Sequence, residues 1–223
     1  SRNGETLSPG RAYSVRPGDR LEFGSASRGL RTYLAVAGGL DVAPVLGSRS
    51  THLAAEMGGF MGRRLEAGDI LETRPSAGAF GSTHAAREEV SIPDPPLLLR
   101  VLPGPQADLF SEESIRRFSE ASFRVSAQSN RMGLRLEGEK ILPVNEAEIL
   151  PEGVPVGAVQ IPPGGDPIIL MPEGPVTGGY AKIACVASAD IPLLGQVRPG
   201  DSVRFAFATE TEALAALRRD GHS

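Results

Sequence analysis

The pentapeptide Val-Arg-Pro-Gly-Asp occurs at residues 15–19, within VRPGDRLEF, and again at residues 197–201, within VRPGDSVRF. In each copy the proline fixes the backbone φ, and the glycine supplies the permissive position of a tight turn. The residues that follow alternate between polar and apolar side chains, which is the pattern of a half-buried strand. A looser relative, LEAGDILE, lies at residues 65–72. The motif therefore predicts turns that lead directly into β-strands.

The two copies of the pentapeptide also share a phenylalanine four residues after the aspartate, at Phe23 and Phe205. This agreement indicates either one fold built twice or a coincidence of a common turn. Only 14 residues precede the first copy, whereas the 100 residues 97–196 precede the second within its half of the chain. If the fold is duplicated, the first copy lacks most of its front, and the chain is expected to be a C-terminal piece of a longer protein.

The composition favours a β protein with many turns. Of 223 residues, 27 are glycine and 19 are proline, spread along the whole chain, and both residue types interrupt helices. There is no tryptophan and only 5% of the residues are aromatic, so the core is expected to consist mainly of Val, Leu, Ile and Ala. We therefore expect a mainly β fold of two barrels with a few short helices, the first barrel being incomplete in this chain.

Charge and cysteine content limit the partners and the compartment. The formal net charge of −4 disfavours nucleic acid, because phosphate binding requires a basic surface. Cys185 is the only cysteine, so no internal disulfide can form, and a cytoplasmic location is the simplest interpretation. No run of about 18 apolar residues is present to span a membrane, and the polar start SRNGETLSPGR is unlike a signal peptide.

A break in composition divides the chain. Residues 75–96 are rich in Ser, Ala, Gly and Pro, which is typical of a linker. This break predicts a first β domain over residues 1–74, a linker over 75–96, a second β domain over 97–209, and a C-terminal helix and tail over 210–223.

Hydrophobic periodicity and turn residues locate the expected strands and helices. The two predicted helices are 111–121, with Ser111 as its N-cap, and 210–219, with Thr209 and Glu212 in capping-box spacing. The predicted strands are 21–23, 31–37, 70–73, 97–102, 134–137, 158–161, 168–171, 183–188 and 203–208.

The common catalytic signatures are absent, since the chain contains no Walker A loop, no G-x-S-x-G elbow and no HExxH. One cysteine and three scattered histidines do not suggest a metal site, and none is predicted. Cys185 lies in an apolar segment, and we interpret it as a small core residue rather than a nucleophile. Asp108 and Asp190 are the nearest acids to the candidate polar segments, and they form no acidic pair.

Several polar, turn-rich segments remain as candidate binding surfaces. Such a segment can equally be an ordinary turn or a solvated surface. Taken together they resemble a surface that recognises amides and carboxylates, because they offer amide, guanidinium and backbone N–H groups without an acidic pair. A double glycine also lets a backbone approach a ligand closely. The candidate residues are Arg49, Gln106, Asn130, Arg131, Gln160, Gly178, Gly179, Tyr180 and Lys182.

Five segments in order give the chain a family resemblance. They are GLRTYLAVAGGLDVAPVLGSRSTHL, RVLPGPQADLF, SAQSNRMGLRLEG, GAVQIPPGGDPIILMPEGPVTGGYAKI and ADIPLLGQVRPGD, and they extend from Gly29 through the strand that ends near Phe207. Together they resemble the allophanate hydrolase subunit 2 family, whose members are also called the C subunit of 5-oxoprolinase, or KipA. The resemblance implies two cyclophilin-like β-barrels, with a further N-terminal segment in full-length members.

The resemblance also implies partners and a reaction. The partners are a KipI-like B subunit, known too as subunit 1, and a lactam-utilisation A subunit, in an oligomeric complex that opens 5-oxo-L-proline to glutamate with ATP. ATP is expected at the level of the complex, since no recognisable ATP motif lies in this chain. On this basis Arg131 and Lys182 are expected to stabilise charge, and the other candidates are expected to bind a small amide or lactam.

Two alternatives stay open. The first is biotin-dependent carboxyl transfer to urea or a related amide, as in urea carboxylase. No biotin-accepting lysine in a Met-Lys context occurs here, so carboxybiotin would come from another domain. The second is a regulatory binding module that counters a KipI-type kinase inhibitor, in which the polar loops form a protein interface.

Overall fold

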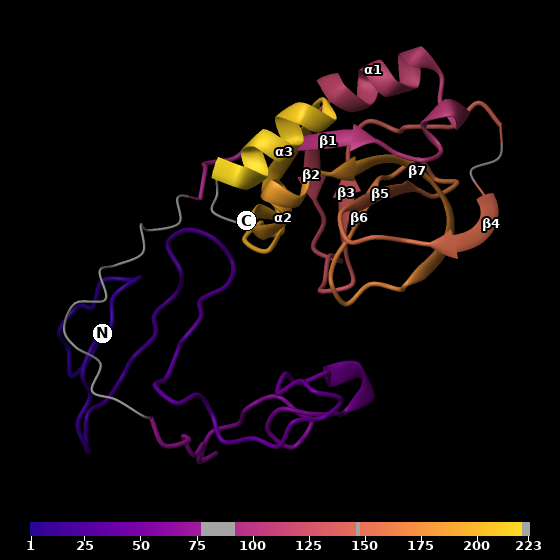
Figure 1. The fold of residues 1–223 in the computed structure, drawn as a ribbon. Coiled ribbons are helices and arrows are strands. Elements are labelled where there is room, and N and C mark those ends of the chain that lie inside the picture. The colour runs from indigo at the N-terminus through magenta and orange to yellow at the C-terminus, as the bar shows by residue number, and fades with distance from the viewer. Residues whose placement is uncertain (77–91, 146–147, 220–223) are drawn as a thin grey trace. The chain divides into compact units, whose positions relative to one another are not determined.

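A computed structural model describes residues 1–76, 92–145 and 148–219 of the chain (Figure 1). The chain divides into two compact units, one formed by residues 1–24 and 32–90 and the other by residues 25–31 and 91–223. Most of the linker predicted at 75–96 and the end of the predicted tail lie outside the described residues. The predicted domain limits therefore stay predictions.

The second unit is a closed β-barrel. Among the described residues its strands follow each other in the order β1, β8, β2, β3, β6, β5 and β7, and the ring closes because β1 also pairs with β7. β1 and β8 run parallel, and the other neighbours are antiparallel. β4 pairs only with β7. The bounds are β1 Leu97–Pro103, β2 Phe123–Val125, β3 Gly133–Glu137, β4 Glu148–Gly153, β5 Ala158–Ile161, β6 Ile168–Leu170, β7 Thr177–Val186 and β8 Ser202–Phe207. The expected mainly β fold is confirmed.

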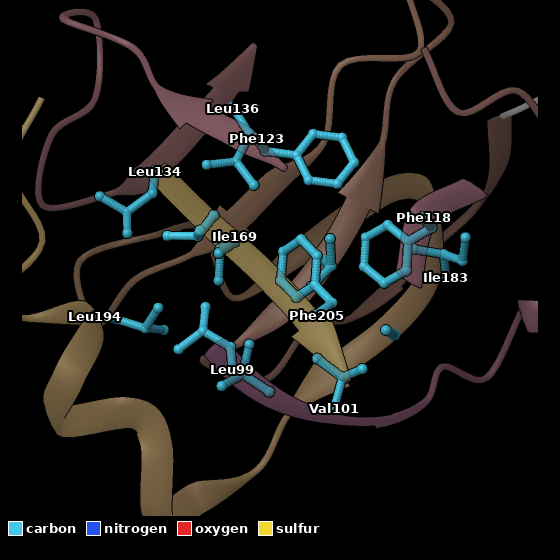
Figure 2. Close-up of a cluster of buried hydrophobic side chains, with 14 of the residues drawn as sticks. Leu99, Val101, Phe118, Phe123, Leu134, Leu136, Ile169, Ile183, Leu194 and Phe205 are labelled. Atoms are coloured by element: carbon cyan, nitrogen blue, oxygen red, sulfur yellow. The ribbon is translucent and has the colours of Figure 1, made fainter. Parts of the chain in front are cut away.

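The barrel is filled by aliphatic side chains and a cluster of phenylalanines. Phe118 and Phe205 stack with their ring centroids 4.3 Å apart, and Phe123 lies 5.7 Å from Phe205. Figure 2 shows these rings among Leu99, Val101 and Ile183. The aliphatic core agrees with the composition, and among the described residues the aromatic side chains buried in it are those of Phe110, Phe118, Phe123 and Phe205.

The two predicted helices form as expected. α1 (Glu112–Glu120) begins after Ser111, whose hydroxyl accepts a hydrogen bond from the backbone N–H of Ser114 at 3.1 Å. α3 (Glu210–Arg219) begins with a capping box between Thr209 and Glu212. The sequence did not predict the short helix α2 (Ile191–Leu194) or the 3₁₀ turns η1 (Leu53–Ala55), η2 (Ala107–Leu109) and η3 (Ser188–Asp190).

The Pro-Gly-Asp motif builds the same turn at each of its full copies. In the second copy the Asp201 carboxylate accepts from the Arg198 backbone N–H at 2.8 Å, and the Asp201 N–H donates to the Arg198 carbonyl at 3.0 Å. Asp19 and Arg16 repeat both contacts at 2.9 and 3.0 Å. The central glycines, Gly18 and Gly200, have φ of +91° and +93°, which only glycine adopts easily. The looser copy ending at Asp69 forms the same pair of contacts.

The strands predicted in the first unit are wrong as regular strands. At 21–23 and 70–73 the structure has only isolated bridges, Arg2 with Leu21 and Leu40 with Thr73, and residues 31–37 form neither a strand nor a bridge. The physical reason is that this unit has no buried face: over its described residues only Gly62 is buried. An alternating segment becomes a strand when a neighbour pairs with its backbone and covers its apolar side.

Three strands of the second unit also differ from expectation. β2 and β4 were not predicted, and β7 begins at Thr177 rather than near Ile183 and ends at Val186. Over the described residues, no helix is both long and apolar enough to cross a membrane.

Candidate functional site

Two polar side chains are buried side by side on the barrel. Gln160 of β5 lies opposite Lys182 of β7 in the strand register, so the two side chains share one face of the sheet. Gln160 is 5% exposed and Lys182 is 1% exposed. Lysine is almost never fully buried without a partner, because removing its charge from water is costly. This pair is therefore the most unusual feature of the barrel.

Glu152 of β4 is the partner of the buried lysine. Lys182 Nζ lies 2.6 Å from Glu152 Oε1, and the same oxygen accepts from Gln106 Nε2 at 2.7 Å. These contacts, first that of Lys182 and then that of Gln106, hold the pKa of Glu152 below its usual value. The carboxylate is therefore ionised at neutral pH and balances the lysine charge.

The loop after β1 carries Gln106 across β7. Gln106 Oε1 accepts from the backbone N–H of Lys182 at 3.3 Å, and the Gly104 N–H donates to the Ile183 carbonyl at 2.9 Å. A Cβ at Gly104 would lie 2.1 Å from the Lys182 carbonyl oxygen. Glycine is thus required for the loop to lie this close to the strand.

Gly178 makes room for Gln160. A Cβ at Gly178 would lie 2.5 Å from Gln160 Nε2. That nitrogen has no hydrogen-bond partner among the described residues, and Lys182 Nζ has none beyond its ion pair with Glu152. Both are donors only, so the site holds unused donors beside a carboxylate.

The double glycine is not the turn that the sequence indicated. Gly178 and Gly179 both lie within β7, where Gly178 is the register partner of Glu152. Tyr180 lies between them and Lys182, opposite Glu148, and is 37% exposed. The absence of side chains at the two glycines lets β4 and the Gln160 amide approach β7 closely.

Arg131 and Asn130 belong to a different loop. The Asn130 side-chain oxygen accepts from the Met132 N–H at 2.8 Å, so this amide shapes its own turn. Arg131 forms an ion pair with Glu173, and its side chain is 55% exposed. Within the described part of the chain, no hydrogen bond or ion pair joins these two residues to the Lys182 cluster.

Arg49 lies in the first unit. Its Nε donates to the Val42 carbonyl at 3.1 Å, and the residue is exposed.

Glu152, the acid that pairs with Lys182, was not predicted from the sequence. The two acids that were named there, Asp190 and Asp108, lie elsewhere. Asp190 is buried, and its carboxylate accepts from the Arg100 backbone N–H at 2.6 Å and from Arg100 Nε at 3.0 Å. It therefore holds η3 against β1. Asp108 lies in η2. Glu152 stands 30 residues from Lys182 in the sequence, and only the pairing of β4 with β7 brings them together.

Comparison with known proteins shows the family to which the chain is similar. Residues 1–207 match the family model described as "Carboxyltransferase domain, subdomain A and B". The chain is 39% identical over 206 residues to the C subunit of 5-oxoprolinase from Escherichia coli, covering 91% of this chain and 64% of that protein. It is 34% identical to urea amidolyase of Lachancea kluyveri, covering 92% of this chain and 12% of that protein.

The solved structure of Kluyveromyces lactis urea carboxylase superposes with a TM-score of 0.85 at 30% identity, covering 96% of this chain and 21% of that one. The chain thus spans less than two thirds of the length of the curated relatives that it matches. On the match over residues 1–207, the chain belongs to the carboxyltransferase-domain family, subdomains A and B.

Proposed function

We propose that this chain is part of the C subunit of an ATP-dependent 5-oxoprolinase, which opens 5-oxo-L-proline to glutamate together with partner subunits in the cytoplasm. The observation that carries the proposal is the buried Lys182 with its partners Glu152 and Gln106, in a chain 39% identical to a 5-oxoprolinase C subunit. The partners are a KipI-like B subunit together with a lactam-utilisation A subunit, and the working form is an oligomeric complex. ATP supplies the driving force at the level of that complex.

The cluster suits an amide carbonyl. A lactam oxygen gains negative charge when its carbonyl carbon is attacked, and a fixed cation in a dry site stabilises that charge strongly. Lys182 is 1% exposed and is held in place by Glu152, so its ammonium group is preorganised to stabilise charge on the lactam oxygen. Gln160 offers a second donor beside it.

The other candidate residues have supporting roles in the proposal. Arg131 is the second catalytic candidate, and its exposed guanidinium suits the carboxylate of the substrate, as does Arg49. Asn130, Tyr180 and the backbone at Gly178 and Gly179 contribute to substrate binding. No residue of this chain is proposed to hold a metal.

The test is reconstitution of the full-length protein with its two partner subunits. We expect ATP hydrolysis that depends on 5-oxoproline, with glutamate as product, and we expect both to stop when this protein is omitted. If turnover continues unchanged without it, the proposal is wrong.

A second candidate function is biotin-dependent carboxyl transfer to urea or a related amide. It is favoured by the similarity to urea amidolyase and by the fold of urea carboxylase. The same preparation, given urea and a carboxybiotin carrier, tests it. Carboxylated urea without any 5-oxoproline turnover would select this function instead.

A further inference from the structure

The centre of the Lys182 cluster has more hydrogen-bond donors than acceptors among the described residues. Gln160 Nε2 is buried with no hydrogen-bond partner among the described residues, and Lys182 Nζ has only the ion pair with Glu152. Buried donors nearly always find an acceptor in folded proteins. Gln160 Nε2 without an acceptor, at a position paired with a buried lysine that has only one, indicates that a ligand supplies an acceptor oxygen.

Glu152 adds a hydrogen-bond acceptor to the same cluster. Its Oε1 accepts a hydrogen bond from Gln106 Nε2 and forms the ion pair with Lys182 Nζ, whereas its Oε2 has no hydrogen bond within the described residues. An ionised carboxylate only accepts, so Oε2 is available to a ligand N–H. The Glu152 side chain is 45% exposed and that of Lys182 is 1% exposed, so a ligand reaches the cluster from the Glu152 side.

Charge narrows the class of ligand. Glu152 already balances the charge of Lys182, so a second anion such as phosphate would face the carboxylate and be repelled. A neutral group that carries a carbonyl oxygen beside an N–H satisfies both capacities. Lactams and ureas place these two groups on one edge, whereas a trans peptide points them in opposite directions.

We infer that Lys182, Gln160 and Glu152 form a subsite for the amide edge of a small lactam or urea. The carbonyl oxygen accepts from Lys182 and Gln160, and the amide N–H donates to the Glu152 carboxylate. This inference rests on the proposed function and deepens it, because it assigns which edge of the substrate faces which side chain.

The test compares 5-oxoproline with its lactone analogue, in which a ring oxygen replaces the N–H. Calorimetric titration of the full-length protein in its complex, without ATP, gives both affinities. We expect the wild type to prefer the lactam by about tenfold or more, because the lactone sets an oxygen against the carboxylate. Glu152→Gln should abolish this preference, since the new amide can donate to the ring oxygen. Glu148→Gln, the same change at an exposed position of β4, should keep it.

A second variant separates recognition from folding. Gln160→Met removes the donor while keeping most of the volume and leaving the Lys182–Glu152 pair in place. We expect it to weaken lactam and lactone binding by the same factor, with their ratio unchanged. An unaltered preference in Glu152→Gln, or unaltered affinities in Gln160→Met, would overturn the subsite.

The outcomes for the subsite and for the proposed function differ. Lactam binding with the expected variant pattern, but without turnover by the complex, supports the subsite and refutes the oxoprolinase activity. Turnover with an unchanged preference in Glu152→Gln refutes the subsite alone. A parallel titration with urea identifies the source of the amide edge: binding of urea in place of 5-oxoproline supports the subsite with urea as its ligand.

Discussion

Lys140 and Lys182 are the only lysines in the chain, and the structure gives them opposite surroundings. Lys140 is exposed and lies 2.5 Å from Asp166 at the surface. Lys182 is buried beside Gln160 and contacts Glu152. A surface ion pair contributes little, whereas a buried charge without its partner is strongly destabilising. Lys140 therefore provides a matched control for every experiment on Lys182.

Cys185 reports on the lysine charge. Burial raises the pKa of the Cys185 thiol, and the nearby charge of Lys182 opposes that rise. Replacing Lys182 by methionine removes the opposing effect, so the pKa of the thiol should rise further. We expect the midpoint of the pH dependence of alkylation by iodoacetamide to move to higher pH in Lys182→Met. Lys140→Met should leave the midpoint in place; a midpoint that does not move in Lys182→Met would show that the lysine charge is not felt at Cys185.

At the scale of elements, the sequence predicted helices and strands best where the determining features lie within the segment itself. β5 and α3 have the predicted bounds, because an apolar run between turns and a capping box are both local features. β4 was not predicted because it contains Pro151 and its side chains are mostly exposed, so it lacks the apolar pattern of a strand. It is a strand because it pairs with β7. Lys182 and Gln160 were predicted as site residues. Glu152 was not, since its role exists only through that pairing.

The loop between β1 and α1 depends on one glycine. A Cβ at Gly104 would collide with the Lys182 carbonyl, so Gly104→Ala must push the loop or β7 aside and weaken the Gln106–Glu152 hydrogen bond. We expect the free energy of unfolding to fall by about 1–3 kcal/mol, measured by urea denaturation. Gly164→Ala is the control, because a Cβ there meets nothing within 4 Å. Equal stability of the two variants would mean that the loop does not need this close approach.

At the scale of the whole molecule, the two units contrast in what they bury. The second unit closes its barrel around a continuous core, whereas the described residues of the first unit bury only Gly62. The shared turn at Asp19 and Asp201 was predictable, because its contacts lie within four residues. The strands expected after the first turn do not form, because a strand requires a neighbouring strand to pair with as well as an alternating sequence pattern.

The proposed function requires the buried Lys182 to stabilise charge during lactam opening. The most direct measurement is 5-oxoproline-dependent ATP hydrolysis by the complex assembled with Lys182→Met or with Lys140→Met, after chromatography has shown that both variants assemble. We expect Lys182→Met to lower kcat by about a hundredfold or more and Lys140→Met to match the wild type. Turnover by assembled Lys182→Met at the wild-type rate would contradict this role of Lys182.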